Sequence, residues 1–361
     1  MTDTRSKPGK FTLIEAGRGI AALLVVLHHA GSIMAEPRFF AGEPFGGHLR
    51  NFNVGVDFFF VLSGFIITWV HAGDFGQPRR LGNYASKRFL RVFPPYWALL
   101  IPLILLYQLF PNAGVERQRD PVNIVLSIFL LPYTSQPVLG VAWTLTHEML
   151  FYALFAALIA WGGRWLWLYA LWGAAIVAVA LAGIALPYPA SFLLSPFNLE
   201  FIMGVAAALM LRRWAIPAPR LVMIAGAAIF LAGVLFALHV QDVPLYGRLF
   251  FGLSSLLFVL GAVETERTHG VRLPAWLGAL GAASYVIYLT HSVAISFACT
   301  ALAKLGGRAL PLELACLLLA AIGLAAGFAY HWTVEAWTVG AARRLLQGAR
   351  GRKEQVEVAA Q

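Results

Sequence analysis

The sequence predicts an all-α, polytopic membrane protein with about ten transmembrane helices, and two observations lead to this fold class. Of the 361 residues, 60% are apolar or aromatic and only 12% carry a formal charge, which is about half the charged share of a typical soluble domain. Apolar stretches long enough to cross the hydrocarbon core, about 20 residues each, also recur along the whole chain without a polar block of domain size between them. We therefore expect one membrane-embedded domain over residues 1–340, followed by a basic cytoplasmic tail over 341–361 that is partly disordered.

The candidate spans follow from the apolar stretches in chain order. They cover residues 12–34, 53–72, 89–110, 142–161, 164–186, 193–212, 220–239, 245–263, 278–303 and 311–336. The stretch 121–132 is apolar but too short to span, and prolines bracket it, so we expect an interfacial or re-entrant segment. The first stretch follows basic residues, as a secretory signal would. His28 and His29 interrupt it, however, and no small-x-small cleavage site follows, so we interpret it as a retained helix.

The distribution of basic residues predicts the orientation of the chain. The formal net charge is +10, but the basic residues gather in short clusters between apolar stretches, where they act as topology signals. We therefore exclude nucleic acid as a partner. With ten spans, 19 Lys and Arg residues fall on the side of the termini and seven on the other, while Arg18 lies inside the first span. The positive-inside rule then predicts that both termini are cytoplasmic.

The two cysteines do not indicate a disulfide or a metal site. Cys299 and Cys316 each lie inside an apolar stretch, and the chain has no CxxC motif and no His/Cys spacing typical of zinc ligands. We expect both to be inert core residues and expect no bound metal.

Arg18 and His29 in the first span are the strongest pair of candidate functional residues. An ionisable residue inside a span costs on the order of 2.5–3.5 kcal/mol on insertion scales, which makes each one a functional candidate. The two are 11 residues apart, or three helical turns plus about 20°, so they share one helix face at a separation of about 16 Å. His28 points about 80° away from that face. The alternative is that His29 is a hydrogen-bonded packing residue and that Arg18 snorkels towards the interface.

Three carboxylates are expected at a membrane depth similar to that of His29. Asp57, Glu148 and Glu200 lie four to seven residues into the outer ends of their spans. A carboxylate beside an imidazole fixes its tautomer and stabilises the imidazolium, as a general base requires. We therefore expect Asp57 or Glu148 to orient a catalytic His29. The alternative is that each carboxylate pairs with an Arg or Tyr and ties helices together.

Further candidates lie in the third, sixth and ninth spans. Arg88 and Arg91 precede a double proline, Pro94-Pro95, which should break or kink the chain where the third span begins. Three residues apart, the arginines share a helix face, and guanidinium groups bind phosphate well, although a positive-inside anchor is an equally good interpretation. Glu200 and His291 are candidates for substrate binding, and packing would explain His291 equally well.

Six ordered sequence blocks resemble the acyltransferase family 3 of integral membrane proteins. They cover nearly the whole membrane domain and read IEAGRGIAALLVVLHHA, FNVGVDFFFVLSGFII, YASKRFLRVFPPYW, AWTLTHEMLFY, NLEFIMGV and SYVIYLTH. The fourth block is similar to that of exopolysaccharide-modifying members. The family's Arg-x10-His motif falls on Arg18 and His29, and its Arg-x-x-Arg motif falls on Arg88 and Arg91. Gly17 and Glu15 depart from the usual residues, but neither change removes a charged group.

The resemblance implies an enzyme of the bacterial cytoplasmic membrane that uses acetyl-CoA or another acyl-CoA. Such an enzyme O-acylates a hydroxyl of a surface carbohydrate, polysaccharide or glycolipid. We expect the donor phosphates to bind Arg88 and Arg91, aided by Arg18, and His29 to deprotonate the acceptor hydroxyl or to carry the acyl group. A transporter or flippase for a lipid-linked sugar is the alternative, although no inverted repeat is recognisable. A purely structural scaffold would leave the intramembrane charges unexplained.

Overall fold

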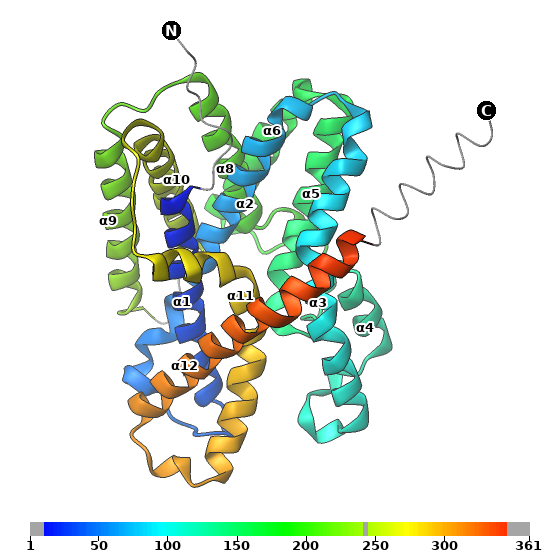
Figure 1. The fold of residues 1–361 in the computed structure, drawn as a ribbon, viewed down its shortest axis with the longest axis vertical. Helices are drawn as coiled ribbons and strands as arrows, with labels where there is room; N and C mark the ends of the chain where they lie inside the picture. Colours follow the sequence, from blue (N-terminus) through cyan, green and yellow to red (C-terminus); the bar gives the residue numbers. More distant parts are fainter. Residues whose placement is uncertain (1–10, 241–244, 345–361) are drawn as a thin grey trace, which may run out of the picture.

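The computed structural model describes residues 11–240 and 245–344, and within them it contains ten helices long and apolar enough to cross a membrane. This number confirms the predicted fold class (Figure 1). Most of the tail expected over 341–361 lies outside the described residues. The helices are α1 (Thr12–Met34), α2 (Gly55–His71), α3 (Leu81–Leu109), α4 (Pro121–Ile128), α5 (Trp143–Trp161), α6 (Leu166–Ala182), α7 (Ala190–Leu193), α8 (Pro196–Arg213), α9 (Pro219–Ala237), α10 (Leu245–His269), α11 (Ala275–Lys304) and α12 (Leu312–Tyr330).

The short apolar segment before residue 132 forms α4, which has only eight residues and is not among the ten candidate spans. Asp120 caps its N-terminus by accepting hydrogen bonds from the backbone N–H groups of Val122 (3.2 Å) and Asn123 (3.1 Å), and Pro121 occupies the first helical position. Both residue types suit these positions because the first N–H groups of a helix lack internal partners. The prediction that this segment is too short to span is confirmed.

The double proline, where a break or a kink was expected, does not break helix α3. It begins at Leu81, before the basic residues, and continues through Pro94 and Pro95. Two tyrosine hydroxyls donate hydrogen bonds to carbonyls in this region, Tyr285 to Val92 (2.9 Å) and Tyr330 to Pro95 (2.7 Å). Side chains of neighbouring helices can support a transmembrane helix where proline disturbs its ladder. The span is therefore not broken here, and its arginines belong to the helix itself.

Glycines allow the central helices to approach one another closely. Helix α1 packs along α11 and also contacts α2, α10 and α12. A Cβ atom at Gly281 of α11 would lie 2.1 Å from the backbone oxygen of Glu15 in α1, and one at Gly204 of α8 would lie 2.0 Å from the oxygen of Val61 in α2. Small residues at such contacts are typical of membrane helix pairs. These contacts fix the rotation of α1 and α2, and hence the directions of their polar side chains.

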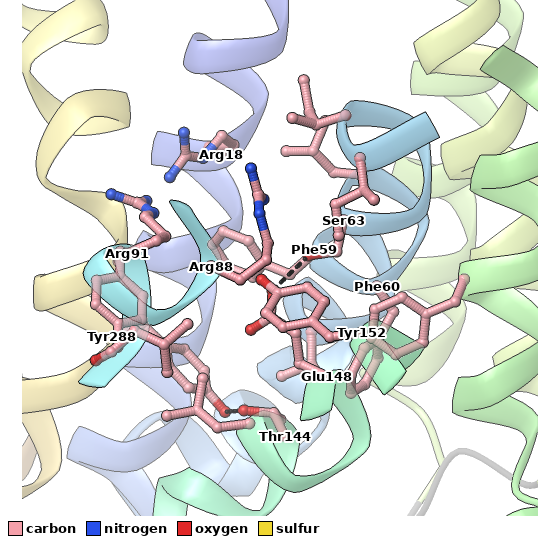
Figure 2. A pocket seen from close by; sticks show the side chains of 18 residues that line it. Arg18, Phe59, Phe60, Ser63, Arg88, Arg91, Thr144, Glu148, Tyr152 and Tyr288 are labelled. Atoms are coloured by element: carbon pink, nitrogen blue, oxygen red, sulfur yellow. Dashed lines mark hydrogen bonds between the residues drawn. The ribbon is translucent and has the colours of Figure 1, made fainter. Parts of the chain in front are cut away.

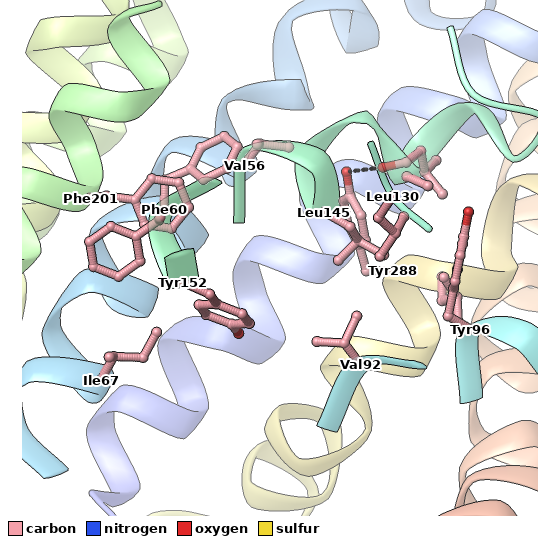
Figure 3. Packing of buried hydrophobic residues seen from close by; sticks show 14 of the residues in the cluster. Val56, Phe60, Ile67, Val92, Tyr96, Leu130, Leu145, Tyr152, Phe201 and Tyr288 are labelled. Atoms are coloured by element: carbon pink, nitrogen blue, oxygen red, sulfur yellow. Dashed lines mark hydrogen bonds between the residues drawn. The ribbon is translucent and has the colours of Figure 1, made fainter. Parts of the chain in front are cut away.

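A large cluster of aromatic and aliphatic side chains holds α3 and α5 against α2, α8 and α11 (Figure 3). The ring of Phe151 in α5 stacks on that of Phe201 in α8 at a centroid distance of 4.6 Å, and Phe60 of α2 contacts Phe201 at 4.8 Å. Since lipid tails are as apolar as these rings, dispersion contacts rather than removal from water favour their packing. The cluster positions the helices that carry Arg88, Arg91 and Glu148.

Helix α12 continues into a π-helical turn over His331–Glu335. In Figure 1 it runs obliquely across the molecule, from beside α11 towards α3. The wider turn of a π-helix changes the angular position of the residues that follow it, and such turns are frequent at functional sites. Here the turn brings Glu335 within 3.4 Å of Arg91.

Candidate functional site

A cavity of about 160 Å³ lies among α1, α2, α3, α5, α8 and α11, and Arg18, Arg88 and Arg91 all line it. Figure 2 shows the three guanidinium groups gathered at one side of this cavity, with Thr144 at the other. Arg88 and Arg91 are three residues apart on α3 and face the same space, as their spacing predicts. The structure thus brings together the three arginines that the sequence placed in two separate spans.

Arg91 and Arg88 differ in whether a carboxylate of the protein already pairs with them. Arg91 lies 3.4 Å from the carboxylate of Glu335 and above the ring of Tyr285, with its guanidinium carbon 4.8 Å from the ring centroid. Arg88 lies over the ring of Tyr152 at 5.7 Å. Among the described residues no carboxylate forms an ion pair with Arg88, and its buried Nε atom has no hydrogen-bond partner. Arg88 is therefore available to an anion from outside the protein.

Glu148 belongs to the arginine-lined cavity and not to the surroundings of His29. Its Oε1 atom accepts hydrogen bonds from Ser63 Oγ (3.2 Å) and from the hydroxyl of Tyr152. Tyr152 lies one turn further along the same helix, α5, so of these two bonds only the one from Ser63 of α2 joins Glu148 to another helix. Glu148 also places a negative charge beside the arginines, which partly offsets their mutual repulsion.

Tyr288 closes the cavity on the side of α11. The hydroxyl of Thr144 donates to Tyr288 OH (3.0 Å), which in turn donates to the carbonyl of Val141 (3.1 Å). The ring of Tyr288 lies 5.9 Å from that of His291, between centroids. The sequence reasoning missed Tyr288, Tyr152 and Ser63, although polar hydroxyls inside apolar spans were a visible signal.

His29 pairs with a second histidine next to this cavity. Its Nδ1 atom lies 3.1 Å from Nε2 of His291 and 3.0 Å from the carbonyl oxygen of Val25. The expectation that Asp57 or Glu148 orients His29 is wrong for this structure, because both carboxylates have other partners. His291, expected only as a substrate contact, is the ring that faces His29.

Asp57 and Glu200 form a separate buried cluster with Arg248. Arg248 Nη1 donates to Asp57 Oδ2 at 2.7 Å, and the side chain of Asp57 is completely buried. Glu200 lies beside Asp57, is also completely buried, and has no hydrogen-bond partner other than Asp57 among the described residues. Neither Asp57 nor Glu200 lines the arginine-lined cavity. Asp57 and Glu200 were expected at a depth similar to that of His29. They do not meet it, because the rotation of α2 and α8 points their side chains elsewhere.

Comparison with known proteins identifies the family. No solved structure matches the chain. The exopolysaccharide production protein ExoZ of Rhizobium meliloti (strain 1021) is 30% identical over 331 residues, covering 87% of this chain and 98% of that protein. Protein 2 in picA locus of Rhizobium radiobacter is 29% identical over 180 residues, covering 45% of this chain and 87% of that protein. A family model described as an acyltransferase domain matches residues 12–330. The chain, with its ten candidate membrane spans, therefore belongs to this acyltransferase family.

Proposed function

We propose that the protein is a membrane-bound O-acyltransferase that moves an acetyl or similar acyl group from acyl-CoA to a hydroxyl of a cell-surface polysaccharide or glycolipid. The observation that carries this proposal is the cavity with three arginines at one side and, at the other, a tyrosine in contact with the His29–His291 pair. The relative named for exopolysaccharide production supports a carbohydrate acceptor. The bacterial cytoplasmic membrane is the expected location, because acyl-CoA is a cytoplasmic donor.

The arginines suit the phosphate groups of coenzyme A. Guanidinium groups bind phosphate oxygens through paired, charge-assisted hydrogen bonds. The cavity volume of about 160 Å³ is below the range of about 300–1,000 Å³ usual for whole-ligand sites. It therefore holds only part of the donor, such as the pantetheine arm with its thioester. Arg18 and His29 are about 16 Å apart along α1, so phosphates bound near Arg18 leave the extended arm to reach the histidines.

His29 supplies the proton transfer in this mechanism. Its ring takes the proton of the acceptor hydroxyl while the hydroxyl oxygen attacks the thioester carbonyl. The new C–O bond forms, the C–S bond breaks, and the leaving thiolate receives a proton from the protonated His29. In a second variant His29 itself accepts the acyl group and then passes it to the hydroxyl. Both variants convert one thioester and one hydroxyl into one ester and one thiol.

The decisive experiment follows label from radioactive acetyl-CoA into polysaccharide and glycolipid fractions. Membranes would contain wild-type protein or the His29→Ala variant at matched expression. We expect transfer with the wild type and a loss of at least about 10²-fold with the variant, the usual contribution of a general base. Transfer that persists in His29→Ala would move the chemistry away from this residue. Sugar translocation without any donor would instead support the transporter alternative.

The same assay tests the donor site through Arg88. Arg88→Gln should raise the KM for acetyl-CoA more than it lowers kcat, because it removes a phosphate contact remote from the reacting carbonyl. Arg79→Gln is the matched control, since this exposed arginine near the start of α3 does not line the cavity. An equal effect of the two substitutions would mean that general surface charge, and not the cavity, attracts the donor.

A further inference from the structure

The backbone contacts of His29 and His291 determine which nitrogen of each ring carries the hydrogen. Each ring places Nδ1 beside the backbone oxygen of the residue four positions earlier, His29 near Val25 (3.0 Å) and His291 near Ile287 (2.9 Å). A carbonyl oxygen only accepts hydrogen bonds, so the ring nitrogen at each contact must carry the hydrogen. Both neutral rings are therefore Nδ1–H tautomers, and the Nε2 atom of each carries a lone pair.

These tautomers determine which ring donates and which accepts the hydrogen bond between the two histidines. His29 Nδ1 lies 3.1 Å from His291 Nε2, so the Nδ1–H of His29 donates and the lone pair of His291 accepts. The same hydrogen is shared with the Val25 carbonyl, which lies 3.0 Å away in α1. The remaining basic atom of His29 is then Nε2.

Burial separates the roles of the two rings. His291 is completely buried, whereas His29 is only partly buried. Of the two rings, it is therefore His29 that has surface a substrate can reach. Of the other titratable side chains, His28 also faces His29, with its ring centroid 4.7 Å away in an edge-to-face arrangement.

We propose that His291 is a positioning residue that holds His29 in the Nδ1–H tautomer, which leaves Nε2 of His29 as the base, and that stabilises the imidazolium formed when this atom takes a proton. This inference rests on the proposed acyl transfer, and it identifies the side chain that activates the base in that reaction. In the step, the hydroxyl proton moves to His29 Nε2 as the C–O bond forms, and it moves on to the thiolate sulfur as the C–S bond breaks. His291 accepts the hydrogen bond throughout and loses no proton.

A histidine has a physical advantage over a carboxylate at this position. A carboxylate would add a full negative charge inside the membrane, which is costly without a cationic partner. A neutral imidazole offers one lone pair in a fixed direction at no charge. Its own Nδ1–H is held by the Ile287 carbonyl, so the acceptor cannot switch to the other tautomer without losing that bond.

Two amide substitutions separate this role from packing. In His291→Gln the side-chain oxygen can occupy the position of Nε2 and still accept from His29, whereas in His291→Asn the amide reaches only as far as Nδ1. We expect His291→Gln to keep kcat within about tenfold of wild type and His291→Asn to lower it by about 10²-fold or more, as for an incorrectly held catalytic base. The KM for acetyl-CoA should not change in either variant. His147→Asn, at a buried histidine of α5 that does not line the cavity, is the matched control and should leave kcat unchanged.

Three outcomes would overturn the proposed role of His291. Equal kcat values for His291→Gln and His291→Asn, in protein that elutes as one species and unfolds at the wild-type temperature, would overturn the proposal. A rise in KM without a loss of kcat would overturn it in favour of a substrate contact. Nitrogen-15 NMR of labelled histidines, assigned with the variants, provides a test without turnover. His29 and His291 should both be neutral Nδ1–H rings, and an Nε2–H ring at His29 would refute the inference even if no acyl transfer is found.

Discussion

The buried charges between α2, α8 and α10 are unequal in number. Asp57 and Glu200 are both completely buried, yet among residues 11–240 and 245–344 only the guanidinium of Arg248 lies with them, and it contacts Asp57. An uncompensated ionised carboxylate at such a depth is too costly, so a buried group neutralises instead. We therefore expect one proton on this carboxyl pair, held mainly by Glu200.

This charge balance predicts a specific order of stability among variants. Glu200→Gln should leave the thermal unfolding temperature nearly unchanged, because the amide replaces a neutral carboxyl of similar shape. Asp57→Asn should cost more, although Glu200 can then ionise and pair with Arg248. The double variant should be the least stable, since removing every partner of a buried charge costs about 3–5 kcal/mol. Unfolding of the purified variants in detergent would measure the order and the non-additivity.

Two outcomes would contradict this order of stability. If Glu200→Gln destabilised the protein as strongly as Asp57→Asn, both carboxyls would be ionised and both would be needed against Arg248. A double variant no worse than the sum of the single variants would show that the two side chains do not substitute for each other.

Residue spacing predicted part of the candidate site. The register of Arg18 with His29 and of Arg88 with Arg91 is a local property of single helices, and the structure places all three arginines at one cavity. The partner of His29 depends on how α11 is rotated against α1, which no local pattern contains. For the same reason the depth of Asp57 in its span could not show that Arg248 would bind it.

At the scale of helices, the contact between α1 and α11 determines whether the two histidines meet. Gly281 lies on the face of α11 that touches the backbone of α1, while Gly278, three residues earlier, has no atom within 4 Å of its hypothetical Cβ. Both glycines lie in the same helix, so they differ only in whether another helix occupies the position that a Cβ atom would take.

Alanine substitution at these two glycines should have opposite effects. In Gly281→Ala the new Cβ would lie 2.1 Å from the Glu15 oxygen, so α11 must shift, at a cost of roughly 1–3 kcal/mol typical of overpacking. The shift should also weaken transfer by separating His291 from His29. Gly278→Ala should be neutral or slightly stabilising, because alanine favours the helix by about 1 kcal/mol. Unfolding temperature and transfer rate, measured on both variants, test this directly. A Gly281→Ala protein with unchanged activity would mean that the helix contact tolerates displacement.

Helices were easier to predict from sequence than their local irregularities. Length and hydropathy were sufficient for the ten spans and for the short α4, because these are properties of continuous stretches. The sequence left open whether Pro94 and Pro95 break α3 or only kink it, since Tyr285 and Tyr330, which support the continuous helix, come from distant parts of the chain. The π turn that brings Glu335 to Arg91 likewise has no counterpart in the hydrophobic pattern.

For the whole molecule, the direction in which it crosses the membrane decides whether acyl-CoA can reach the arginines. The excess of basic residues at the ends of the spans predicts that the termini and the loop before α3 face the cytoplasm. The loop between α11 and α12 would then face outwards. Arg79 is exposed in the first loop, and Leu305, 84% exposed, lies in the second.

Thiol labelling can test this topology because the two native cysteines, Cys299 and Cys316, are both buried. In intact cells a membrane-impermeant maleimide should label Leu305→Cys and should not label Arg79→Cys. After permeabilisation both should react, and the unsubstituted protein provides the background. The reverse pattern would place the start of α3 outside the cell. Because Arg88 is nine residues beyond Arg79 on the same helical segment, the donor phosphates would then have to bind on the side where acyl-CoA is absent. The proposed donor would fail on topology alone, independently of any activity measurement.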